Sequence, residues 1–351
     1  MPSLALRRLF FSLLVTTLTS LVVLVSALPQ QHNPNPNPCR MAATTPSPSK
    51  PKSSLAQLVS LSNYRHEESL NHSPITLFVY ATMNGYKGPI CCEELGIAYN
   101  YCVIDFEKGQ QKSSQFLRIN PKGQIPALYD SDSDIMLAES AAILEYLATK
   151  YNENIPTLLP DPTQEAKQHW AVKQWMLFSA TGLAPAMGNA MFFNRIATTK
   201  GVPHLEYSIE RYTSQSRHLL EVLNLQLIQS GGPYLLGGEH MTIADINAFT
   251  YASTHYWAMV SIDGLNALKA WIDLLMNRPS IQKGLQIPFG RPGFFGPPYA
   301  TPEDINDEIQ RNAGMFTKEG GGTNNSTSTS TSSSRKNNKS NERKKKKPKG
   351  T

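Results

Sequence analysis

The chain has 351 residues, a formal net charge of +6 at pH 7 and a pI near 9.0, values that by themselves point to an anionic partner. The charge is unevenly distributed, because residues 73–317 hold 17 Lys and Arg against 23 Asp and Glu. These residues are numerous enough to bury a substantial core. Since this globular stretch is acidic, we exclude nucleic-acid binding through it and assign any such role to the tail.

The first 72 residues predict a targeting segment followed by a disordered leader. Arg7 and Arg8 precede Leu9–Leu28, an uncharged apolar run of about the length of one membrane span. Small residues around Ala27 are typical of a signal-peptide cleavage site. The pattern predicts membrane association and entry into the secretory pathway. The alternative is a translation start at Met41, which would leave the protein in the cytoplasm.

Residues 319–351 are rich in Gly, Ser, Thr, Asn and Lys and predict a disordered tail. Its "KKKKPK" segment is a nuclear-import signal, a patch for anionic surfaces or simply a solvated tail. Asn324, Asn325 and Asn338 begin glycosylation sequons, which matter only if this end is luminal.

Residues 73–152 alternate between strand and helix signals in the order β-α-β-α-β-β-α. This order is the thioredoxin-like layout, so we expect an α/β thioredoxin-like N-terminal domain. The strands and helices are expected at Ile75–Tyr80, a helix ending near Gly96, Tyr99–Phe106, Ser114–Arg118, two strands beginning at Pro126, and Ala138–Tyr151.

Three features of this half carry binding chemistry. A cis bond at Ile125–Pro126 would turn the backbone of Ile125 outward to pair with a short extended peptide. Glu139 and Ser140 lie at a predicted helix N-terminus, which favours a carboxylate, although Ser140 can instead be an N-cap. Thr82 and Asn84 precede the first helix, whose N-terminus would stabilise a thiolate.

No cysteine occupies the turn where thioredoxin-type folds place a reactive pair. The four cysteines form no Cys-x-x-Cys, no metal-binding spacing and no disulfide framework, and no metal site is predicted. We interpret Cys91 and Cys92 as small apolar residues of a helix rather than reactive thiols. Any thiol chemistry at the turn therefore needs a thiol from a ligand.

Residues 163–287 predict an all-α C-terminal domain, and residues 288–318 form an extension without an assigned role. Thr242 and Asp245 fit a capping-box variant, which makes Asp245 structural. Aromatic and Met side chains line an apolar co-substrate pocket or pack in the core: Trp175, Met191, Phe192, Phe193 and Tyr212. The helices are expected at Gln164–Arg195, loosened by Gly182 and Pro185, then at Leu205–Ser230, Ile243–Val260, Leu265–Met276 and Ser280–Leu285.

Residues 75–287 resemble the soluble glutathione transferases. They look most like the branch of the yeast nitrogen-catabolite regulator and the bacterial Nu-class disulfide-bond oxidoreductases. The resemblance rests on the order and spacing of several segments: "TMNGYK" at 82–87, "EKGQQ" at 107–111, "INPKGQIPAL" at 119–128, "ESAAILEYLA" at 139–148, "GLAPAMGNAMFFN" at 182–194, "SIERY" at 208–212 and "GGEHMTIADI" at 237–246.

The resemblance implies the glutathione transferase fold, a homodimer, and a ligand thiol in place of the missing cysteine. Thr82 and Asn84 would hold the glutathione sulfur, and Ile125, before Pro126, would pair with the cysteinyl backbone. Glutathione contacts are also implied for Glu139 and Ser140 on the γ-glutamyl group, and for Gln111 and Arg211. One departure is Met83, where the branch usually has Pro.

The implied function is an enzyme that activates glutathione as a thiolate. The thiolate would attack a small electrophile or a glutathione mixed disulfide. The alternative is a non-catalytic regulatory or scaffold protein on the same fold.

Overall fold

The computed structural model describes residues 73–315 except 107, 198–200, 202, 204 and 291–292. All of these residues belong to one compact unit, Ser53–Thr351. The predictions for the apolar segment, the leader and the basic tail lie outside the described residues. Within the described ranges, no helix combines the length and the apolar character needed to span a membrane.

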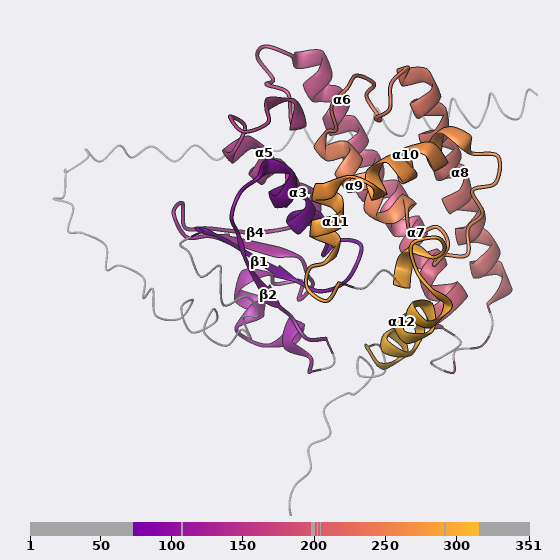
Figure 1. Cartoon of the computed structure of the whole chain (residues 1–351). Coiled ribbons are helices and arrows are strands. Elements are labelled where there is room, and N and C mark those ends of the chain that lie inside the picture. The colour runs from indigo at the N-terminus through magenta and orange to yellow at the C-terminus, as the bar shows by residue number, and fades with distance from the viewer. Residues whose placement is uncertain are drawn as a thin grey trace, which may run out of the picture. The chain divides into compact units, whose positions relative to one another are not determined.

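A four-stranded mixed sheet forms the N-terminal part, with strand order β2-β1-β3-β4 (Figure 1). The central strand β1 is parallel to β2 and antiparallel to β3, and β3 is antiparallel to β4. Every residue of β1 is buried, which explains why its sequence is apolar except for Thr76. The strands are β1 (Ile75–Val79), β2 (Asn100–Val103), β3 (Ala127–Asp130) and β4 (Ile135–Ala138).

Helices cover both faces of the sheet. Leu77 and Val79 belong to the core that includes α3 (Lys87–Leu95) and α5 (Ser140–Lys150). Phe78 points to the other face and packs on Phe116 of α4 (Phe116–Ile119). The alternation follows from the period of two in a strand. The predicted thioredoxin-like order is therefore confirmed.

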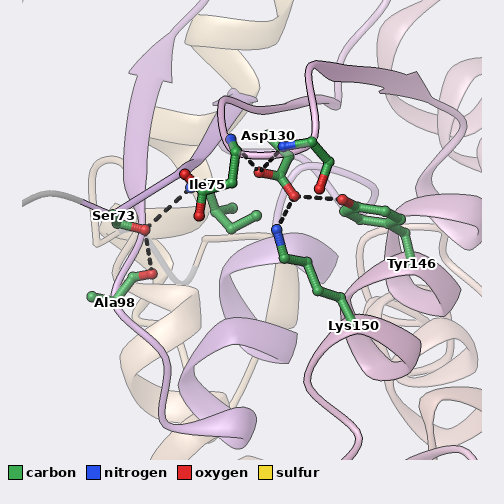
Figure 2. Close-up of polar contacts among 8 residues, drawn as sticks. Ser73, Ile75, Ala98, Asp130, Tyr146 and Lys150 are labelled. Carbon is green, nitrogen blue, oxygen red and sulfur yellow. Dashed lines mark hydrogen bonds and ion pairs between the residues drawn. The ribbon is translucent and has the colours of Figure 1, made fainter.

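Asp130 ties the sheet to the C-terminal end of α5 (Figure 2). This fully buried carboxylate accepts hydrogen bonds from the Tyr146 hydroxyl and the Lys150 ammonium. It also accepts the backbone N–H groups of Asp132 at 3.0 Å and Ser133 at 3.4 Å. The network satisfies the carboxylate within the fold.

Helices make up the C-terminal part, as predicted (Figure 1). The long helix expected at Gln164–Arg195 is interrupted by two π-helical segments, η3 and η4. Pro185 supplies one physical reason, since it has no N–H for an α-helical bond and lies just after η3. The elements are η2 (Pro156–Leu158), α6 (Ala166–Leu177), η3 (Phe178–Leu183), α7 (Ala184–Met191), η4 (Phe192–Ile196), α8 (Glu206–Ser230), α9 (Ile243–Ala252), α10 (Asn266–Met276) and α11 (Pro279–Leu285).

Helix α9 is shorter than the predicted Ile243–Val260, because it ends at Ala252. The Thr254 N–H bonds the Tyr251 carbonyl, three residues back, at 3.1 Å, so the α-helical pattern of bonds stops there. The Thr254 hydroxyl donates to the same carbonyl at 2.8 Å. Its start agrees with the prediction. Asp245 accepts from Thr242 N–H and Oγ1–H, both at 2.9 Å, and from the indole of Trp271 at 3.0 Å, which confirms its structural role.

Helix α11 packs closely on α3 and so fixes the helix that begins at the candidate site. A side chain at Gly284 would bring its Cβ to 2.6 Å from the Ile90 Cα, so only glycine permits this approach. Glu94 of α3 is hydrogen-bonded by Arg278 Nε at 2.8 Å, just before α11. These contacts join the two parts of the fold.

The extension after Pro288 folds back onto the body. It contains η6 (Gly293–Phe295) and α12 (Pro302–Met315). Phe294 packs edge-on against Trp257 with ring centroids 5.2 Å apart, and Phe295 lies 6.1 Å from the ring of Tyr86. Both phenylalanines are buried, so this segment is part of the core.

Candidate functional site

The turn between β1 and α3 presents the Thr82 hydroxyl. Thr82 Oγ1 accepts the Gly85 N–H at 3.1 Å. Glycine is required at 85, because a Cβ there would come 2.0 Å from the Tyr80 carbonyl oxygen. Among the described residues, no acceptor takes the proton of the Thr82 hydroxyl. Thr82 therefore retains a proton to donate to a ligand.

Glu139 and Ser140 lie at the N-terminus of α5, as predicted. Glu139 is the N-cap and has a φ of 67°, which is unusual for a non-glycine residue. Ser140 is the first helical residue, so the alternative that it caps the helix is wrong. Its hydroxyl instead donates to Asn84 Oδ1 at 3.3 Å. The turn after β1 and the start of α5 thus meet at one place.

Lys87 is a residue of this site that sequence reasoning missed. Its side chain is 1% exposed, and its Nζ donates to Ser140 Oγ at 3.3 Å. The ammonium also lies 5.3 Å from the ring centroid of Tyr251 on α9. Burial lowers the pKa of Lys87 to about 7, against the opposing effect of the Glu139 carboxylate. The available signal was that Lys87 is the only charged residue between Ser73 and Cys92.

Tyr251 closes the network from the helical part. Burial raises the pKa of its hydroxyl to about 12, and a hydrogen bond with the Asn84 side chain opposes that rise. The tyrosine therefore stays neutral at physiological pH. Asn84 is held from two sides, by Ser140 on its oxygen and by Tyr251.

The Ile125–Pro126 peptide bond is cis, as expected. Among the described residues, the Ile125 backbone N–H and C=O have no hydrogen-bond partner. Gln111 lies near this loop, since a Cβ at Gly123 would come 2.8 Å from the Gln111 carbonyl oxygen. The side-chain oxygen of Gln111 is buried and unpaired within the described part of the chain. These groups are free to pair with a peptide-like ligand.

Arg211 stands apart from the other predicted residues. It is exposed on α8, donates to the Tyr207 hydroxyl at 3.1 Å and lies 6.0 Å from the ring of Tyr212. No contact in the described structure joins it to the residues around Ser140. Its role in binding stays a prediction.

The remaining candidates are mostly structural. Trp175 and Met191 are buried in the main core, which favours the core interpretation for them. Phe193 stacks on Tyr212 with centroids 5.5 Å apart, and both are half-buried. Cys91 and Cys92 are fully buried, and burial raises the pKa of both thiols, so they are inert as interpreted. In the described ranges, no three His, Cys, Asp or Glu side chains are grouped to hold a metal ion.

Two family profiles match the chain. A glutathione S-transferase N-terminal domain matches residues 73–149, and a glutathione S-transferase C-terminal domain matches residues 203–286. Among curated proteins, the disulfide-bond oxidoreductase YfcG of Escherichia coli is 33% identical over 216 residues, covering 60% of this chain and 94% of that protein. Protein URE2 of Eremothecium gossypii is 30% identical, covering 60% of this chain and 67% of that protein.

Solved structures give the same picture. A glutathione transferase family member from Pseudomonas fluorescens, with two glutathione bound, has a TM-score of 0.55 and 33% identity, covering 61% of this chain and 93% of that one. A glutathione transferase from Pseudomonas putida, with one glutathione disulfide bound per subunit, has a TM-score of 0.54 and 29% identity, covering 63% and 94%.

Proposed function

The chain belongs to the glutathione S-transferase family, and from this premise we propose that it binds glutathione and activates its thiol as a thiolate. The carrying observation is the 3.3 Å hydrogen bond between Ser140 and Asn84. It brings the carboxylate-binding N-terminus of α5 against the turn that holds Thr82. A single small peptide with a carboxylate at one end and a thiol nearby would contact both.

The predicted contacts follow from the free groups of the site. The γ-glutamyl carboxylate lies at Ser140 and the N–H groups of α5, with its amine at Glu139. The cysteinyl backbone pairs with the unpaired backbone of Ile125. The unpaired side-chain oxygen of Gln111 accepts an N–H of the ligand.

Thr82 is the better donor to the sulfur. Asn84 already accepts from Ser140 and bonds Tyr251, whereas the proton of the Thr82 hydroxyl is free among the described residues. A free thiol with a pKa of about 8.5 is only about 3% ionised at pH 7. Lowering that pKa by about two units requires about 2.7 kcal/mol, which a hydroxyl donor and a helix N-terminus can supply together.

The thiolate serves two reactions. It displaces a leaving group from an electrophilic carbon and forms a thioether. Alternatively, it attacks the sulfur of a glutathione mixed disulfide, forms glutathione disulfide and releases the other thiol. The likeness to a disulfide-bond oxidoreductase and to a structure with bound glutathione disulfide supports the second reaction.

The test compares Thr82→Ala with Asn84→Ala in pH–rate profiles with 1-chloro-2,4-dinitrobenzene and with a glutathione mixed disulfide. Thr82→Ala should raise the pKa of the bound thiol by about 1 unit, equivalent to about 1.4 kcal/mol, with little change in glutathione affinity. Asn84→Ala should move the profile less. If neither variant shifts the pH–rate profile, Thr82 does not activate the thiol. If the wild type turns over neither substrate, the proposed enzymatic function is wrong.

A regulatory role is the second candidate. It is favoured by 28% identity to the transcriptional regulator URE2 of Saccharomyces cerevisiae, of which this chain covers 67%. A regulator on this fold would bind glutathione in calorimetry but turn over neither test substrate.

A homodimer is part of the proposal. Trp170 and Leu177 are seven residues apart on α6 and therefore share one helix face, where they are 64% and 60% exposed. Such exposed apolar side chains are suited to an interface. Sedimentation of residues 41–351 at micromolar concentration should give a soluble dimer, and a monomer would contradict this assignment.

A further inference from the structure

Lys87 lies between the two halves of the site. It begins α3, is almost fully buried and donates to Ser140 at 3.3 Å. Among the described residues, Lys87 forms no ion pair. A buried ammonium without an anionic partner is costly, because it has lost its hydration. A bound anion would therefore stabilise the charged form of Lys87.

The hydrogen bond from Lys87 sets the orientation of the Ser140 hydroxyl. Ser140 Oγ accepts from the Lys87 ammonium, so the single hydroxyl proton of Ser140 points away from Lys87, toward Asn84. Donation by an ammonium also polarises the hydroxyl and makes it a stronger donor. A carboxylate arriving at the N-terminus of α5 would take over this proton from Asn84 Oδ1, the neutral acceptor that holds it at 3.3 Å in the free protein.

We propose that Lys87 is a positioning residue for glutathione, which orients the Ser140 hydroxyl toward the γ-glutamyl carboxylate and supplies the positive charge required by an anion bound there. The inference deepens the proposed function and rests on it. Lys87 acts through Ser140 and does not touch the reacting sulfur. It also differs from Ser140 and Glu139, because its contribution depends on its own protonation.

The protonation of Lys87 makes the inference measurable. The groups that face it are Ser140 and Glu139 at the start of α5, Asn84 on the preceding turn and Tyr251 on α9. Of these, Glu139 is the only carboxyl group, and Tyr251, with a pKa of about 12, is neutral near pH 7. In the free protein, burial holds the pKa of Lys87 at about 7, so the amine is largely neutral at pH 7.5 to 8. A bound carboxylate favours the charged form and raises this pKa.

Ligand binding above pH 7 should therefore take up a proton. The free enzyme must first protonate Lys87, so affinity falls as pH rises above about 7, by at most about tenfold per pH unit. S-methylglutathione is the suitable probe, because it keeps the γ-glutamyl carboxylate and has no thiol to titrate. Its amine contributes equally to every variant, so differences between variants report Lys87.

The experiment is calorimetry of the full chain with S-methylglutathione at pH 7.5, in phosphate and in Tris, which differ in ionisation enthalpy. We expect the wild type to take up about 0.5–0.8 proton more than Lys87→Met, since Lys87 with a pKa of about 7 is roughly three-quarters neutral at pH 7.5 before binding. Lys87→Met should bind at least about tenfold more weakly than the wild type at pH 6.5. Lys87→Arg keeps a fixed charge and should restore affinity without the extra proton uptake. Lys269→Met, an exposed change on α10, should behave as the wild type.

The outcomes separate this inference from the proposed function. If the wild type binds but Lys87→Met binds as tightly and with the same proton uptake, Lys87 has no positioning role and the proposed function stands. If Lys87→Met does not fold, the wild type is compared with Lys87→Arg instead. Equal proton uptake by these two proteins overturns the inference, whereas greater uptake by the wild type supports it. If the wild type binds neither glutathione nor S-methylglutathione between pH 6 and 8, the proposed function falls and this inference falls with it.

Discussion

A lysine lies at each end of helix α5, and the two differ in whether a carboxylate accepts a hydrogen bond from the ammonium. At the C-terminal end, Lys150 pairs with the buried Asp130 carboxylate, which Tyr146 and two backbone N–H groups also satisfy (Figure 2). At the N-terminal end, Lys87 meets a hydroxyl and an aromatic ring. A network that a carboxylate completes within the protein stabilises the fold, whereas the network at Lys87 is the one that we propose a bound carboxylate completes.

The pKa shifts of the two lysines are opposite in sign. Burial would lower the pKa of Lys150, but the hydrogen bond to Asp130 and the attraction of nearby negative charge, chiefly that of Asp130, together outweigh burial and raise the pKa above the ordinary value. Burial dominates at Lys87 and lowers its pKa to about 7. The presence of a carboxylate partner therefore decides whether a lysine here is a permanent cation or a titrating group.

The largest expected effect comes from breaking the complete network. Asp130→Ala removes the acceptor of Lys150, Tyr146 and two N–H groups, and should reduce the free energy of unfolding by about 3–5 kcal/mol in urea denaturation. The exposed Asp132→Ala in the same turn is the control and should change it by less than about 0.5 kcal/mol. A loss below about 1 kcal/mol for Asp130→Ala would mean that water replaces the network without cost.

Changing Ser140 tests the network at Lys87, where we expect an effect on ligand affinity rather than on stability. Ser140→Ala removes the hydroxyl between Lys87 and the proposed carboxylate, and should weaken glutathione binding by about 1–3 kcal/mol in calorimetry while the protein remains folded. Thr149→Ala, an exposed change near the other end of α5, is the control. Unchanged affinity for Ser140→Ala would remove the carboxylate from this end of the helix.

Much of the fold follows from local pattern. The apolar run Ile75–Val79 and the capping residues Thr242 and Asp245 each determine their element within a few residues, and the structure agrees. The predicted end of α9 was wrong, because the N–H and the hydroxyl of Thr254 both bond the Tyr251 carbonyl, three residues back, where the α-helical pattern stops. Side-chain hydrogen bonds of this kind do not alter the hydrophobic period that the sequence displays.

The candidate site was predictable in part. The turn at Thr82, the helix start at Ser140 and the cis bond before Pro126 were found from sequence, the last two because helix starts and X-Pro bonds have local signatures. Lys87 was missed because its burial depends on Tyr251, far along the chain. A lysine in the first turn of a helix is ordinarily solvated, and no local pattern shows that a second domain covers it.

Stability without ligand should depend on pH through Lys87. Its folded pKa of about 7 lies below the ordinary value, so between these two values the unfolded chain binds more protons and stability rises with pH. From pH 7 to 8 the wild type should gain about 1 kcal/mol from this residue in urea denaturation, near the limit of about 1.4 kcal/mol per pH unit. Lys87→Met should lack this gain. Equal slopes for the two proteins would contradict a titrating Lys87.

The smallest effect is expected at a third lysine, Lys122, which faces the same Glu139 from the solvent side. Its Nζ lies 3.5 Å from a Glu139 oxygen, but the two side chains are 61% and 71% exposed. Water and salt screen such a pair, and holding two long side chains in one geometry costs entropy.

Lys122→Met should therefore change the free energy of unfolding by less than about 0.5 kcal/mol. The rise in the free energy of unfolding from pH 7 to 8 should persist in this variant, because that rise comes from Lys87. Urea denaturation at 0.05 and 0.5 M salt checks both statements. A loss above about 1 kcal/mol would show that the ion pair with Lys122 stabilises the fold strongly. Lys122, rather than Lys87, would then be the main partner of Glu139, and the comparison between Lys87 and the lysines paired with carboxylates would be wrong.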